Sequence, residues 1–203
     1  MSCSGPANLD LNGEQQAAVC ATALLDILEA CLHARSSEWI FLRELRLGRG
    51  TRNNFAQRLD GFALNCLPHL AMKRVCYEVK TSRADFFCEL RQPLKRRMGL
   101  RYSNEFYFVT PPGLVELSEI PVECGLIEAG PTLPDSWRTL SEKHAGFFHF
   151  DAQTKGFCVI KLPAPWRDTP APTWQFAAAM LRNQSRQLKE RPPAPPKQQR
   201  LEL

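Results

Sequence analysis

The stretch CYEVKTSRADF, residues 76–86, reads as a buried β-strand that carries two charges, Glu78 and Lys80. Successive side chains of a strand point to opposite faces, so these two residues point the same way. Burying unpaired charge is costly, and two charges held together on one strand face indicate either an ion pair or a functional site. Ser82 is a good helix N-cap, and Asp85 suits the first turn of the helix that would follow.

The flanking segments predict alternating helices and strands. Helically spaced apolar residues predict a first helix at 11–35, with Asn12 as its N-cap. A helix at 83–98 should be interrupted at Pro93, which lacks a backbone N–H. The expected strands lie at 38–48, 58–67, 72–82, 104–113 and 124–130. This order is typical of the α/β class, with a central mixed β-sheet flanked by helices.

The C-terminal part predicts a loop, a hairpin and one more helix. A loop rich in Pro and Ser is expected at 131–145, and Thr173 could cap the final helix. We therefore expect a single domain at 1–189, with a core at about 13–130, a C-terminal hairpin and helix at 145–189, and a disordered Pro-rich tail at 190–203.

Composition narrows the protein class. No apolar run reaches the ~18–20 residues that span a bilayer, and the N-terminus lacks a basic segment followed by an apolar one, so we expect a cytoplasmic protein without a membrane partner. The eight cysteines are scattered, which favours reduced thiols over a zinc site. The net charge is +5, but residues 40–103 hold fourteen Lys and Arg against five Asp and Glu. Such a basic segment suits a polyanion such as nucleic acid.

Acidic residues interrupt three consecutive expected strands at Glu44, Asp60 and Glu78. Facing side chains on adjacent strands lie about 4.5–5.5 Å apart, where like charges repel unless a cation lies between them. Hard oxygen ligands suit Mg²⁺ or Mn²⁺. The alternatives are plain ion pairs, of Glu78 with Lys80, or of Glu44 with Arg43 or Arg46.

Four segments in the same order resemble the PD-(D/E)XK nuclease superfamily, and more closely its MmcB-like, phage-associated group. They are RLDGFAL at 58–64, YEVKTSRADF at 77–86, ELRQPLKRR at 89–97 and FYFVTPPGLVELSEIPVECGLIE at 106–128. The similarity covers about residues 41–128. The chain departs from the group at Gly61, where alanine is usual, and at Gln92, where an acidic residue is common. Leu59 replaces the proline that often precedes the aspartate.

The resemblance implies a restriction-endonuclease-like core and a metal-dependent nuclease that hydrolyses DNA in repair, recombination or phage DNA metabolism. Asp60 and Glu78 would bind Mg²⁺ or Mn²⁺, together with the backbone carbonyl of Val79, and Lys80 would be the catalytic lysine. Glu44 matches a glutamate on the group's first strand and would be a further ligand or a contact to a metal-bound water.

Basic residues around these positions are expected to contact DNA, although a solvated helix face is the alternative for the run at 95–97. They are Arg49, Arg52, Arg58, Arg83, Lys95, Arg96 and Arg97. Other possibilities are a non-catalytic nucleic-acid-binding protein on a nuclease fold, or an enzyme that acts on RNA or a small phosphate ester. A homodimer is also possible.

Overall fold

The computed structural model describes residues 19–47, 57–144 and 146–190. Three expectations concern residues outside these ranges: the helix cap at Asn12, the DNA contacts of Arg49 and Arg52, and the tail from residue 191 onward.

The described chain forms five α-helices and a seven-stranded sheet, with three short 3₁₀ turns. The helices are α1 (Ala21–Leu32), α2 (Arg83–Leu90), α3 (Arg97–Tyr102), α4 (Trp137–Lys143) and α5 (Trp174–Glu190). The strands are β1 (Trp39–Leu47), β2 (Gln57–Asn65), β3 (Arg74–Val79), β4 (Glu105–Thr110), β5 (Gly125–Gly130), β6 (Phe148–Asp151) and β7 (Gly156–Leu162). The 3₁₀ turns are η1 (Pro68–Leu70), η2 (Pro93–Arg96) and η3 (Leu117–Glu119).

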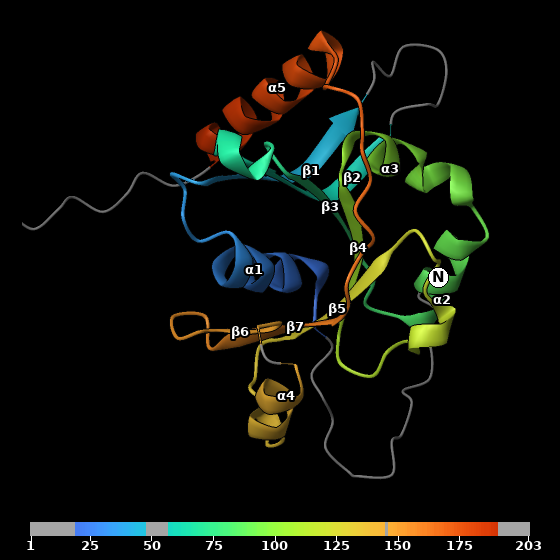
Figure 1. The fold of residues 1–203 in the computed structure, drawn as a ribbon, viewed down its shortest axis with the longest axis vertical. Helices are drawn as coiled ribbons and strands as arrows, with labels where there is room; N and C mark the ends of the chain where they lie inside the picture. Colours follow the sequence, from blue (N-terminus) through green and yellow to red (C-terminus); the bar gives the residue numbers. More distant parts are fainter. Residues whose placement is uncertain (1–18, 48–56, 145, 191–203) are drawn as a thin grey trace, which may run out of the picture.

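The sheet is mixed, in the order β1-β2-β3-β4-β5-β7-β6. Its first three strands are antiparallel, β3, β4 and β5 are parallel, and β7 and β6 add an antiparallel hairpin at the far edge. The sheet curves around α1, and the opposite face carries α2, α3 and α5 (Figure 1). The expected α/β class, with a mixed central sheet and flanking helices, is therefore confirmed.

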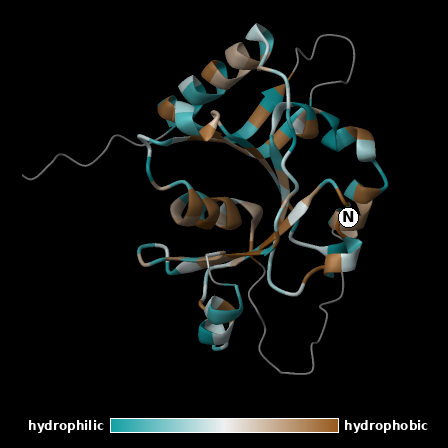
Figure 2. Ribbon diagram, in the orientation of Figure 1, coloured by the Kyte–Doolittle hydropathy of each residue, from teal (hydrophilic) through white to brown (hydrophobic). Residues whose placement is uncertain are grey.

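Each face of the sheet has its own apolar core. On one face α1 packs Leu24, Leu25, Ile27 and Leu28 against alternate residues of β2 to β5 and β7. This agrees with the hydrophobic colouring along most of α1 in Figure 2. On the other face Phe86 and Phe176, from α2 and α5, pack against the remaining alternate positions. Because β3 is covered on both faces, a charged side chain on it must find partners inside the protein.

Local signals placed most element boundaries correctly. The helix expected at 83–98 is divided into α2, η2 and α3, and η2 begins at Pro93 as the missing N–H requires. Thr173 Oγ1 accepts a hydrogen bond from Phe176 N, 3.3 Å away, at the start of α5.

Two expectations were wrong. Val19 and Cys20 are not helical, and α1 begins at Ala21 after Cys20 in an extended conformation. The short helix α4 lies within the expected loop at 131–145, in a segment without a side-chain N-cap bond to mark its start. None of the helices in the described ranges has the length and apolar character needed to cross a membrane.

Candidate active site

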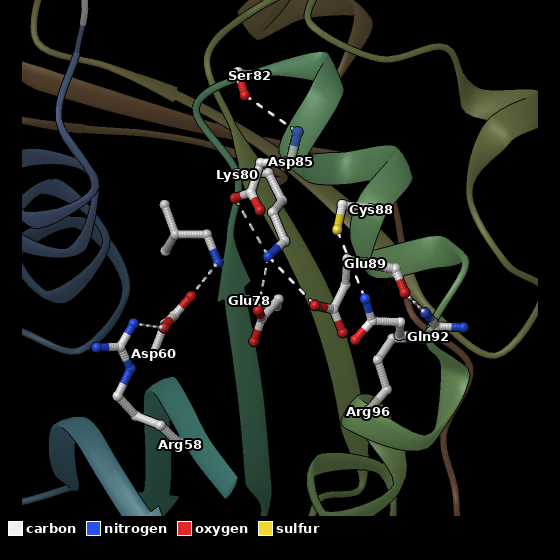
Figure 3. A network of polar contacts seen from close by, with 11 residues as sticks. Arg58, Asp60, Glu78, Lys80, Ser82, Asp85, Cys88, Glu89, Gln92 and Arg96 are labelled. Atoms are coloured by element: carbon white, nitrogen blue, oxygen red, sulfur yellow. Dashed lines mark hydrogen bonds and ion pairs between the residues drawn. The ribbon is translucent and has the colours of Figure 1, made fainter. Parts of the chain in front are cut away.

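Glu78 of β3 and Lys80, which directly follows the strand, lie on the face of the sheet that α2 covers. Val75, Tyr77 and Val79 belong to the core around α1, so the intervening Glu78 points to the other side. The Lys80 side chain is only 6% exposed, and its Nζ is 2.9 Å from Glu78 Oε1. The Glu78–Lys80 ion pair, which was the alternative to a functional site, is therefore present. Figure 3 shows that the Lys80 ammonium also lies at the centre of a larger polar network.

Helix α2 supplies two further carboxylates to Lys80. Ser82 Oγ accepts a hydrogen bond from Asp85 N at 3.2 Å, so the helix begins directly after the strand. Asp85 and Glu89 are one helical turn apart, and each has a carboxylate oxygen 3.5 Å from Lys80 Nζ. Sequence reasoning gave Asp85 only a structural role and assigned none to Glu89. Their i, i+4 spacing behind the charged strand was the available signal.

Asp60 lies opposite Glu78, where the ladder between β2 and β3 opens. The ladder runs as far as Gly61 opposite Tyr77, and the next facing positions in this register are Asp60 and Glu78. Asp60 Oδ2 accepts a hydrogen bond from Val79 N at 3.1 Å. The Asp60 carboxylate thus takes the place of a backbone acceptor and joins β2 to the last residue of β3 beyond the end of their ladder.

Glu44 and Arg58 complete the described surroundings of Asp60. Glu44 has a φ of 49°, an uncommon conformation for a residue in a strand. Its carbonyl accepts a hydrogen bond from Asn183 Nδ2 of α5 at 3.2 Å. The Arg58 guanidinium lies 3.6 Å from Glu44 and 3.5 Å from Asp60, so it bridges the two carboxylates. Arg43, a partner considered for Glu44, instead pairs with Asp26 and Glu29 of α1.

The alternation of side chains between the two faces of β1 and β2 changes at Glu44, the residue with a φ of 49°. Leu42 pairs with Phe62, and Leu45 pairs with Leu59, yet all four belong to the same core. Three residues along a regular strand would reverse the face, so the alternation must reset across the Glu44–Asp60 position. The acidic positions of β1 and β2 therefore occupy a local irregularity that α5 holds in place.

The described network has an excess of negative charge. Asp60, Glu78, Asp85 and Glu89 face the cations of Lys80 and Arg58. Burial, followed by the nearby Asp60 charge, raises the pKa of Glu78 from 4.5 to about 7. Burial also raises the pKa of Asp60, although the Val79 N–H and Arg58 oppose the shift. Burial alone would lower the pKa of Lys80, but Glu78, Glu89 and Asp85 together raise it.

The donor chemistry of the site fits a hard divalent cation. Within the described ranges, no group of three or more His, Cys, Asp and Glu side chains is arranged to hold a metal ion. Asp60 and Glu78 are nevertheless carboxylates at facing positions, and burial is the main cause of the raised pKa of each. Mg²⁺ needs only one or two carboxylates, because it keeps several of its waters.

The expected DNA-contacting residues fall into different environments. Arg83 binds Glu119 through two nitrogens and also donates to the Leu114 carbonyl, so it joins α2 to the η3 region. Arg96 is 5% exposed, donates to the Glu89 carbonyl and lies 3.6 Å from Glu123. Packing of η2 therefore buries Arg96, whereas both interpretations of the run at 95–97 place it on the surface. Lys95 and Arg97 are exposed and have no ion-pair partner among the described residues.

Comparisons with known proteins leave the function open. No family model matches the chain, and no curated protein matches it. One similar solved structure is the SPO1766 protein of unknown function from Silicibacter pomeroyi, with 17% sequence identity and a TM-score of 0.48. The match covers 82% of this chain and 85% of that protein.

Proposed function

We propose that this protein is a divalent-metal-dependent nuclease that hydrolyses phosphodiester bonds in DNA. The observation that carries the proposal is the meeting of Asp60, Glu78 and Lys80 where the β2–β3 ladder ends, with surplus negative charge. A structural ion pair requires one carboxylate for one ammonium. Lys80 instead has three carboxylates within 3.5 Å, and Asp60 adds a fourth acidic group to the network.

Each residue of the site would have its own role in metal binding or hydrolysis. Asp60 and Glu78 would hold the metal ion, with the Val79 carbonyl and Glu44 as candidate additional ligands. When bound, the ion would polarise the scissile phosphate and lower the pKa of a bound water. Lys80 would hold the attacking water or stabilise negative charge that develops on the phosphate oxygens. Glu89 is buried beside Lys80, so it would keep the ammonium protonated and in place.

The basic surface would bring the polyanionic substrate to these residues. Arg58 is 54% exposed next to Asp60, so its guanidinium can exchange a carboxylate partner for a phosphate. Lys95 and Arg97 are exposed on η2 and α3, after the helix that carries Asp85 and Glu89. Binding through such residues should weaken steeply as salt concentration rises.

The test is a cleavage assay on single-stranded and duplex DNA with Mg²⁺, Mn²⁺ or EDTA. The wild type should cut only with metal, and Asp60→Asn and Lys80→Met should each lower the rate about 10²-fold or more. Lys73→Met is the matched control, since Lys73 forms a 2.7 Å ion pair with Glu105 elsewhere on the sheet. Equal loss of activity in all three variants, or cutting by the wild type in EDTA, would contradict the proposal.

A non-catalytic nucleic-acid-binding protein is the second candidate. This candidate is supported by the ion pairs of Lys80 with three carboxylates, because such pairs suit a structural role as well as a catalytic one. Metal-independent DNA binding by the wild type, without cleavage of any DNA form, would favour this candidate. Parallel assays on RNA and on a small phosphodiester would separate DNA hydrolysis from the other substrate classes.

A further inference from the structure

Two cysteines meet on the face of the sheet opposite the candidate active site. Cys31 lies in the last turn of α1 and is half-buried, whereas Cys158 of β7 is completely buried. Cys31 Sγ is 3.7 Å from the Gly156 carbonyl oxygen and 3.9 Å from that of His149. Gly156 precedes Cys158 by two residues, and His149 pairs with Cys158 across the β6–β7 ladder. The Cys31 sulfur therefore lies over the part of β7 that carries Cys158.

The packing of α1 on β7 shows that both side chains point into this contact. A Cβ atom at Gly156 would lie 2.5 Å from Ile27, so this face of β7 is pressed against α1. Cys158 points to the same face as Gly156, because the two are two residues apart in a strand. Cys31 follows Ile27 by one helical turn, so it lies on the same face of α1. Both thiols also belong to the core around α1.

We propose that Cys31 and Cys158 form a peroxide-sensitive dithiol pair, in which Cys31 is oxidised first and Cys158 resolves it to an intramolecular disulfide. The Cys31 thiolate would attack one oxygen of hydrogen peroxide, and the O–O bond would break with release of hydroxide, which takes up a proton to form water. The Cys158 sulfur would then attack the resulting sulfenic acid, with loss of its proton and a second water. Two thiols are oxidised and one peroxide is reduced by two electrons.

The surroundings of the two sulfurs differ as this chemistry requires. A hydrogen bond with Cys158 is the largest influence on Cys31, and it lowers the Cys31 pKa, whereas the same contact and burial raise the pKa of Cys158. The partly exposed Cys31 sulfur is thus the better nucleophile, and the buried Cys158 is the resolving thiol. Cys76 and Cys124 are also buried, but burial raises both of their pKa values, that of Cys124 to about 12.

The disulfide would join the end of α1 to β7, two elements far apart in the chain. His33 lies two residues after Cys31, and its Nε2 is 2.7 Å from the Tyr77 hydroxyl oxygen. This end of α1 therefore also contacts β3. The proposal does not depend on nuclease activity, since none of the residues assigned to catalysis takes part.

The experiment is peroxide treatment of the folded protein, thiol blocking, and digestion with trypsin and a Glu-specific protease. These enzymes release ACLHAR, residues 30–35, and GFCVIK, residues 156–161, each with a single cysteine. The expected product is the disulfide-linked pair of these peptides, lighter by two hydrogen atoms than the two reduced peptides together. The linked pair should disappear after reduction.

Two variants and one control separate the roles of the two thiols. Cys158→Ala should stop at a sulfenic acid on Cys31 that dimedone traps, and Cys31→Ser should leave Cys158 reduced. Cys66→Ser is the control, because Cys66 is also half-buried and also contacts a backbone carbonyl, that of Leu64. It should form the linked peptides as the wild type does. Absence of the linked peptides from the wild type, or oxidation of Cys66 as fast as Cys31, would overturn the proposal even if Cys158→Ala fails to fold.

Discussion

Replacing Glu78 by glutamine should make the metal-free protein more stable at pH 8. Glu78 is buried beside Asp60, and its pKa is raised from 4.5 to about 7. Each unit of pKa difference between the folded and unfolded states corresponds to about 1.4 kcal/mol. Ionised Glu78 therefore costs the folded state on the order of 3 kcal/mol at pH 8, and the neutral amide avoids this cost.

The pH dependence follows from the sign of the shift. Between pH 4.5 and about 7 the folded state binds the Glu78 proton more tightly than the unfolded state does. The contribution of Glu78 to stability is therefore fully present below pH 4.5 and is lost as pH rises through about 7. The difference between wild type and Glu78→Gln should be small at pH 4.5 and should grow toward pH 8.

Urea unfolding in EDTA at several pH values between 4.5 and 8.5 measures this difference. Glu105→Gln is the matched control, since Glu105 is also a partly buried strand glutamate paired with a lysine, Lys73 at 2.7 Å. Glu105→Gln should not be more stable than the wild type at pH 8. This substitution removes the ion pair with Lys73 and relieves no repulsion between neighbouring carboxylates. Addition of Mn²⁺ at 100 times its dissociation constant should stabilise the wild type and Glu105→Gln by about 2.7 kcal/mol, but not Glu78→Gln.

Parallel stability curves for the wild type and Glu78→Gln across the pH range would refute this reasoning. The carboxylates would then not be crowded enough to disfavour ionisation. A loss of stability in Glu78→Gln at pH 8 would have the same meaning, with the Glu78–Lys80 pair acting as a simple structural contact.

Three further changes test the fold by urea unfolding. Ser82→Ala should cost about 1 kcal/mol through loss of the α2 cap, and an unchanged midpoint would mean that the cap contributes nothing. Phe108→Ala should cost about 3–5 kcal/mol, because the ring is fully buried between α2 and the sheet, and a cost below 1 kcal/mol would contradict that packing. Gly125→Ala should cost about 1–3 kcal/mol, since its Cβ would lie 2.6 Å from Ala164 N, a backbone atom that cannot rotate away. A tolerated alanine at residue 125 would refute this close approach.

The sequence predicted the order of strands and most of their limits because those features depend on nearby residues. A buried, mostly apolar stretch defined β3, Ser82 defined the start of α2, and Pro93 divided the helix that follows. The short helix α4 has no such cap or breaker, and its pattern resembled a polar loop.

The candidate site was only partly predictable from the sequence. The β-strand period placed Glu78 and Lys80 on one face, and the order of strands brought Asp60 to the neighbouring position. The roles of Glu89 and Arg96 were not readable, because a charged helix residue looks the same in sequence whether it faces solvent or the sheet.

Local chemistry thus determined where the strands and most of the helices begin and end, and which charges interrupt the central strand. Only the tertiary structure decided the partners of those charges. It packed α2 so that Asp85 and Glu89 reach Lys80, buried Arg96, and placed the Cys31 sulfur beside the Gly156 carbonyl of β7. The physical reason is that the burial and ionisation of a side chain depend on groups that approach through space, and α1, β7 and α2 meet the sheet from distant parts of the chain.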